Sequence, residues 1–270
     1  MAQPRLDDVF AWLDDHQVPD SIRQTAYEHA SPALRSQIKQ AIHCLYKSFG
    51  TRHTHAQHTL IHDGEMVQST EKPYDWVVLL LSAQKNACAR ITCQAILPRL
   101  AGVAHIIACF EAMPAKESLL ALELCGIDDI VLDDEPWSLP PLPGSLGVCS
   151  MRDSLPTLPH TATLLLAETP PRLGILDPEA FDSALLASLH GSLPKTVSAQ
   201  NLPVLDALFL AKVAKEDPAL CANSHLANAL LLTPGFEGFW LYPNLTPQSF
   251  TTTTRLLCAA PPNPFGDTLC

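Results

Sequence analysis

The chain has 270 residues and is acidic, with 28 Asp and Glu against 17 Lys and Arg side chains and a formal net charge of -11. That balance offers no positive field for a phosphate backbone, so we expect no nucleic-acid partner. Hydrophobic residues make up 47% of the chain, enough to fill the core of a globular protein. The apolar runs are far shorter than the roughly 20 residues that cross a bilayer, and the N-terminus lacks a secretory apolar core, so we expect no membrane partner and a cytoplasmic protein.

The nine cysteines are scattered along the chain and form no CxxC pair. Several lie in apolar stretches, where a reduced thiol packs as a small hydrophobic side chain. This pattern favours a reducing compartment and buried packing over a disulfide framework or a catalytic thiol.

The N-terminal segment 1–52 is expected to be helical, because apolar residues recur three or four positions apart in much of it. Ser31 followed by Pro32 is typical of an N-cap and a first helical position. Further on, Asp63 and Gly64 lie between two short runs of mixed polarity, which indicates a tight β-hairpin.

Residues 76–132 alternate between strand and helix patterns. The expected strands are 76–81, 103–110 and 127–132, and the expected helices between them end at Gly102 and Gly126. Strands joined by helical crossovers form a parallel sheet with helices on both faces, so we predict an α/β protein with a Rossmann-like sheet. The hairpin and this unit make up the predicted segment 53–135. Sheets of this kind bind small ligands beyond the carboxyl ends of their strands.

The remaining segment, 136–270, is predicted to be a second, trimmed α/β portion. A long connector rich in proline and glycine, 133–161, is expected to hold neither helix nor central strand. The other expected elements are a buried strand at 161–168, a helix at 178–191 capped by Asp177, a helix at 202–216, strand or mixed segments at 225–232 and 239–244, and an irregular tail from Cys258.

Four stretches resemble, in order, the family of histidinol dehydrogenase, which is distantly similar to the aldehyde dehydrogenases: 31–49, 62–82, 91–110 and 153–171. The third carries the most specific likeness, because Pro98, Ala101, Gly102 and Val103 match a family helix that ends in a proline and an Ala-Gly-Val run. The resemblance implies a Rossmann-like fold, descent from NAD-linked oxidoreductases and NAD as the expected cofactor.

The functional positions of that family are altered in this chain. Ser82 and Ala83 replace its paired glycines, and Ala187 stands where the family has a zinc-ligating glutamine, with His190 at the position of the histidine. The Ser-His-Leu run at 224–226 lacks the glutamate of the family's acid-base pair. We therefore expect no zinc site and no zinc-dependent oxidation of histidinol.

The turn at 82–86 is the main candidate for ligand binding. Backbone N–H groups at the start of a helix can hold an anion, so Ser82, Ala83 and Gln84 are predicted to contact a cofactor, with Lys85 adding charge. Glu111 follows the next strand, where an acid can accept hydrogen bonds from a ribose. The alternatives are an ordinary turn capped by Asn86 and, for Glu111, a solvated strand-end carboxylate, and in both cases we favour the alternative over ligand contact.

Glu168 and His190 are the candidates for a catalytic role. Glu168 ends a predicted strand, and His190 follows an apolar helix face. For Glu168 we favour a solvated strand-end carboxylate. For His190 we favour a helix-terminal side chain that interacts with the last carbonyl groups over a zinc ligand.

Two further groups of residues carry alternative interpretations. The histidines of the hairpin are either a metal site or a solvated face, and we favour the solvated face; they are His53, His55, His58 and His62. The aromatic segment 235–244 is a pocket wall, a self-association patch or the core packing of a C-terminal strand, and we favour core packing.

Three functional hypotheses follow. The first is a diverged relative of histidinol dehydrogenase without its zinc-dependent chemistry that retains a pocket for a nucleotide or another small ligand. The second is an active NAD(P)-dependent oxidoreductase with rearranged catalytic groups. The third is a non-catalytic interaction protein.

Overall fold

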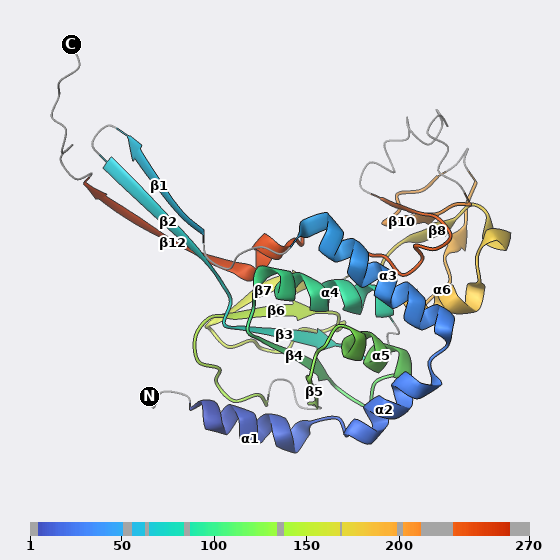
Figure 1. Ribbon diagram of the computed structural model, residues 1–270, viewed down its shortest axis with the longest axis horizontal. Helices are drawn as coiled ribbons and strands as arrows, with labels where there is room; N and C mark the ends of the chain where they lie inside the picture. Colours follow the sequence, from blue (N-terminus) through green and yellow to red (C-terminus); the bar gives the residue numbers. More distant parts are fainter. Residues whose placement is uncertain are drawn as a thin grey trace, which may run out of the picture.

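The computed structural model describes residues 5–50, 56–62, 65–83, 87–133, 138–167, 169–198, 202–211 and 229–259. Its α-helices are α1 (Leu6–His16), α2 (Asp20–His29), α3 (Pro32–Phe49), α4 (Cys88–Ala101), α5 (Lys116–Leu124) and α6 (Ser183–His190). Its strands are β1 (Ala56–His62), β2 (Glu65–Pro73), β3 (Trp76–Leu81), β4 (His105–Phe110), β5 (Asp129–Leu132), β6 (Leu146–Ser150), β7 (Ala162–Ala167), β8 (Leu173–Ile175), β9 (Lys195–Thr196), β10 (Ala207–Phe209), β11 (Leu230–Leu232) and β12 (Thr251–Ala259). They form two parallel sheets and one antiparallel sheet (Figure 1).

The first sheet has five strands in the order β5-β4-β3-β6-β7, and every neighbouring pair is parallel. The strands and helices predicted between residues 76 and 132 are all present, so the predicted Rossmann-like unit is confirmed. All six residues of β3 are buried, because helices and connectors cover both faces of the sheet at its centre. The boundary predicted at residue 135 passes through this sheet, since β6 and β7 follow it.

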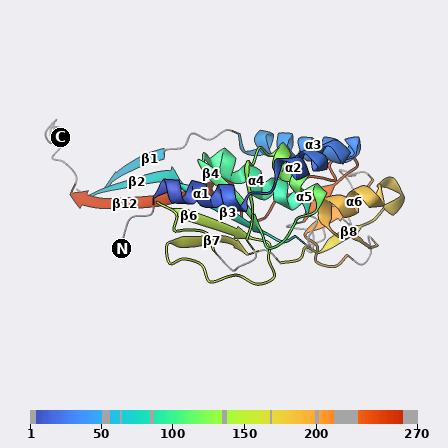
Figure 2. The same cartoon turned by 90° about the horizontal axis from the view of Figure 1, so that it is seen from below.

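The two faces of the first sheet have different covers. Helices α4 and α5 pack on one face, with α2 and α3 outside them (Figures 1 and 2). On the other face, Val9 and Leu13 of α1 pack in one apolar cluster with Trp76 of β3 and with Leu139 and Leu142 of the connector. Helix α1 and the connector therefore cover this face together.

Two sequence predictions about this sheet are corrected. The connector 133–161 contains β6, a buried strand that lies between β3 and β7. The sequence did not reveal this strand, because five residues among prolines and glycines are too few to show an alternating pattern of apolar residues. The strand is stabilised by pairing with β3 on one side and β7 on the other. The strand predicted at 161–168 is present as β7, but it lies at the edge of the sheet and is partly exposed rather than buried.

The second sheet is smaller, with the order β11-β10-β8-β9, and its strands are parallel and two or three residues long. The helix predicted at 202–216 is wrong for the part that the structure describes, because residues 207–209 form β10. Pairing with β8 and β11 outweighs the apolar spacing there. Likewise, residues 239–244 form no strand, whereas 230–232 form β11.

The helix predicted at 178–191 begins later than expected. Pro178–Ala180 forms a single 3-10 turn, and α6 starts at Ser183. Asp182 caps it, because its carboxylate accepts hydrogen bonds from the backbone N–H groups of Ala184 at 2.9 Å and Leu185 at 3.2 Å. Asp177 instead accepts a hydrogen bond from the N–H of Ala211.

A three-stranded antiparallel sheet, β1-β2-β12, extends from one end of the body, and the second sheet lies at the opposite end (Figures 1 and 2). We call it the arm. The predicted hairpin is confirmed, since β1 and β2 pair with His62 opposite Glu65. The predicted irregular tail is wrong up to residue 259, because β12 pairs along the whole length of β2. Four consecutive threonines favour an extended backbone at its start.

Helix α4 lies at the centre of the body and contacts α3, α5 and α6. Thirteen of its fourteen residues are buried. Pro98 stands four residues before its C-cap, and Gly102 ends the helix in the left-handed conformation at φ 87°, as the sequence predicts. Among the described helices, none is long and apolar enough to cross a membrane.

Candidate functional site

Polar side chains gather at the carboxyl edge of the first sheet. Ser82 and Ala83 follow β3, Glu111 follows β4 and Arg152 follows β6. Since the three strands are parallel neighbours, their carboxyl ends meet at one edge. We call these four residues the edge cluster.

The turn after β3 holds a carboxylate. The Ser82 hydroxyl donates a hydrogen bond to Oε1 of Glu111 at 2.9 Å, and the Ala83 backbone N–H donates to the same oxygen at 3.0 Å. The structure thus brings together three of the four residues predicted to contact a cofactor. The fourth, Gln84, lies outside the described residues, together with Lys85 and Asn86.

Arg152 brings a positive charge to the same place. Its side chain is only 12% exposed, and its Nε lies 3.5 Å from Oε2 of Glu111. The guanidinium also donates to the carbonyl oxygen of Leu81, the last residue of β3, at 3.4 Å, and to that of Cys109, the next-to-last residue of β4, at 3.2 Å. The charge therefore lies directly over the carboxyl ends of β3 and β4.

Sequence reasoning missed Arg152 because β6 was not predicted in the proline-rich connector. Without that strand, nothing placed residue 152 at the edge of the sheet. The signal that could have found it is a cation two residues after the short apolar run Leu146–Ser150, a position that becomes informative once the run is recognised as a strand.

The buried thiols have raised pKa values, both in β4 beside Arg152 and at the end of α5. Burial raises the pKa of Cys109 to about 12, although Arg152 opposes the shift, and burial likewise raises the pKa of Cys125 to about 12. Thiols with such pKa values stay protonated near neutral pH and are poor nucleophiles. Together with Cys88, Cys93 and Cys149 they are buried, as expected for packing residues.

NAD is the cofactor that the sequence resemblance implies, and whether its phosphate groups fit the edge cluster depends on Glu111. A phosphate group matches the donors of the turn and the charge of Arg152. That position holds the Glu111 carboxylate, whose Oε2 is itself buried against Arg152. The edge cluster therefore fits a phosphate once the Glu111 side chain moves away. Ser82 carries a side chain where the resembled family has a glycine, so a ligand cannot come as close to the backbone of this turn as two glycines would allow.

His190 lies in the core, away from the edge cluster. It is 1% exposed, and its Nε2 donates to the carbonyl oxygen of Glu237 at 2.7 Å. Its ring packs edge-on against Phe209, with centroids 5.3 Å apart. Burial lowers the pKa of His190 to about 4. The histidine ends α6 as expected, but its hydrogen bond goes to a distant loop rather than to the last carbonyl groups of the helix.

Other candidates are only partly visible. Glu168 lies outside the described residues, as do His53 and His55, and nothing is described for the side chains of His58 and His62. Within the segments that the structure describes, no three His, Cys, Asp or Glu side chains converge in a way that could hold a metal ion.

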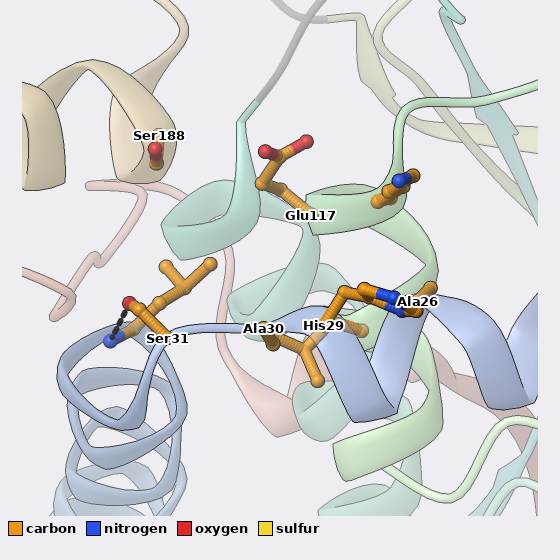
Figure 3. A pocket seen from close by; sticks show the side chains of 9 residues that line it. Ala26, His29, Ala30, Ser31, Glu117 and Ser188 are labelled. Carbon is orange, nitrogen blue, oxygen red and sulfur yellow. Dashed lines mark hydrogen bonds between the residues drawn. The ribbon is translucent and has the colours of Figure 1, made fainter.

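A separate cavity of about 240 Å³ lies among α2, α3, α5 and α6 (Figure 3). His29, Lys116 and Glu117 are the charged or titratable side chains that line it. Two hydroxyls on its wall are already engaged within their own helices, since Ser31 accepts from the N–H of Leu34 and Ser188 donates to the carbonyl of Ala184. None of the residues predicted from the sequence to bind a ligand, a metal or a cofactor, or to act in catalysis, lines this cavity.

The aromatic segment 235–244 packs partly inward. Trp240 is 4% exposed and lies beside His190, and the Tyr242 hydroxyl accepts a hydrogen bond from Gln94 of α4. Phe236 is 41% exposed. The core packing that we favoured is thus present for Trp240, although in a loop and not in a strand.

No protein-family model and no curated protein matches the sequence. Among solved structures, the histidinol dehydrogenase of Elizabethkingia anophelis is similar to this chain, with a TM-score of 0.55 and 12% identity over 91% of this chain and 77% of that one. An NAD-dependent benzaldehyde dehydrogenase from Corynebacterium glutamicum matches 99% of this chain and 91% of its own, with 10% identity and a TM-score of 0.40. The first likeness shows the fold, a distant form of the one that the sequence resemblance implied, and the second is too distant to support an argument.

Proposed function

We propose that this chain is a diverged protein of dehydrogenase fold that binds a nucleotide at the carboxyl edge of its first sheet and does not carry out zinc-dependent oxidation of histidinol. The observation that supports binding is the edge cluster, where a hydroxyl, a backbone N–H and a guanidinium surround one anionic group. Donors of this kind suit the phosphate of a nucleotide.

The position of His190 supports the loss of the chemistry. A general acid or base must reach the proton that it transfers, and it works best with a pKa near the operating pH. The His190 side chain is buried and hydrogen-bonded to a backbone carbonyl, and its pKa lies well below neutrality. Of the two predicted catalytic candidates, the described one therefore serves packing.

Isothermal titration of the purified chain with NAD tests the binding. We expect a saturable heat that is lost in Arg152→Met, because the guanidinium is the only positive charge placed in the edge cluster as described. Glu179→Gln is the matched control, since it alters an exposed acid on the 3-10 turn Pro178–Ala180. A flat trace for the wild-type chain would contradict the proposal.

The lost chemistry has its own test. Incubation with histidinol and NAD is expected to produce no NADH absorbance, with or without added zinc. Steady formation of NADH that requires Glu168 or His190 would instead support an active oxidoreductase with rearranged catalytic groups.

A further inference from the structure

The edge cluster is closed by one of its own residues. Glu111 occupies the place between the turn and the guanidinium, and neither of its oxygens is free for a ligand. Oε1 accepts two hydrogen bonds, and Oε2 is buried and faces Arg152. In this state an incoming phosphate meets a carboxylate instead of open donors.

We propose that Glu111 is an internal competitor, a latch that a phosphate group must displace from Ser82, Ala83 and Arg152 before it can bind. This inference rests on the proposed function, and it adds that the nucleotide site is autoinhibited. The charges agree with it, because a phosphate placed beside the Glu111 carboxylate in this partly buried position would be repelled by it. The donors also agree, because the hydroxyl and the N–H each have one proton to donate.

The geometry permits the exchange. Glu111 is 35% exposed and follows the end of β4, so its side chain can swing outward without disturbing the sheet. Arg152 stays in place meanwhile, because the carbonyl oxygens of Leu81 and Cys109 hold its guanidinium. Displacement of the carboxylate thus leaves an assembled set of donors.

The latch predicts the opposite result from a ribose acceptor. If Glu111 accepts hydrogen bonds from a ribose, its removal weakens NAD binding. If Glu111 is a latch, its removal strengthens NAD binding. When the open state of the site makes up only about one tenth of the molecules, the apparent affinity for NAD is about tenfold weaker than that of a site that is always open.

The experiment compares the wild-type chain, Glu111→Ala and Glu111→Ala/Arg152→Met by isothermal titration with NAD and, separately, with inorganic phosphate. We expect Glu111→Ala to bind NAD about tenfold more tightly than the wild-type chain. The double variant is expected to lose this gain. If Glu111→Ala also binds inorganic phosphate, a free phosphate is enough to occupy the opened site. If it binds NAD but not phosphate, the phosphate must be part of a nucleotide. Both outcomes agree with the latch.

The failures are distinguishable. If no chain binds NAD or phosphate, both the proposed function and the latch are wrong. If the wild-type chain binds NAD and Glu111→Ala binds it equally or less tightly, only the latch is wrong. Glu111→Gln keeps the size of the side chain and is expected to change affinity in the same direction, so it serves if the alanine variant does not fold. Glu179→Gln should leave every affinity unchanged.

Discussion

The body and the arm of this molecule are stabilised in different ways. In the body, both faces of the first sheet are covered, and Leu79 at the centre of β3 has no exposed surface. In the arm, the strands are held by antiparallel pairing, and Leu256 of β12 is 55% exposed. The comparison shows that hydrophobic burial stabilises the body, whereas Leu256 of the arm gains little from burial and its strand is held by backbone pairing with β2.

The largest effect is expected in the body. Leu79→Ala should lower the free energy of unfolding by about 2–5 kcal/mol, because it removes buried methyl groups and leaves a cavity in the central strand. Chemical denaturation followed by circular dichroism measures the loss. A loss below about 1 kcal/mol would mean that the first sheet is not packed as tightly as its burial indicates.

The second effect is a dependence on pH that comes from His190. The folded-state pKa, about 4, lies below the ordinary value of 6.5, so the unfolded chain binds a proton first as the pH falls. The stability from the neutral ring is complete above pH 6.5 and is lost as the pH falls toward 4, by roughly 3 kcal/mol at most. His190→Gln should flatten this part of the stability profile, which chemical denaturation at a series of pH values measures.

The third effect concerns the loop that accepts the His190 hydrogen bond. Oε2 of Glu237 accepts from the side-chain amide of Gln37 at 2.6 Å and from the N–H of Gly235 at 2.8 Å. Glu237→Ala leaves these donors without that acceptor, so we expect a loss of about 1–3 kcal/mol. Glu179→Ala is the control. An equal loss of unfolding free energy in both variants would mean that the buried carboxylate of Glu237 does not stabilise the loop.

The smallest effect is expected in the arm. Leu256→Ala should change the free energy of unfolding by less than about 0.5 kcal/mol, because the side chain is largely in water. Denaturation at several protein concentrations measures the change. A larger loss that depends on concentration, with a dimer seen by light scattering, would break the comparison, since it would mean that a second chain covers the arm.

The sequence predicted the elements whose patterns are long or repeated. The alternation around Gly102 and Gly126 was sufficient to predict the parallel unit, and Ser31 with Pro32 correctly marked the start of α3. The sequence could not predict β6, β8 or β10, because strands of three to five residues show no period and form only through pairing with distant strands.

The same limit applies to the edge cluster. Position in the fold pointed to Ser82, Ala83 and Glu111, but the hydrogen bonds among them depend on side-chain geometry that no spacing reveals. Arg152 could not be found until β6 was known. His190 was predicted as a candidate because it occupies a position in the family pattern. That position does not reveal that Phe209 and Trp240 pack around the ring and bury it.

The pairing of β12 with β2 sets an order of assembly on the ribosome. Thr252 lies opposite Lys72, so the arm needs a strand that is translated long after its hairpin, whereas the last strand of the first sheet ends at Ala167. During synthesis the sheet can close while the hairpin still waits for its third strand. Until then β2 carries an open edge to which another extended segment can add, so a nascent chain that stalls before β12 should be the form most prone to aggregation.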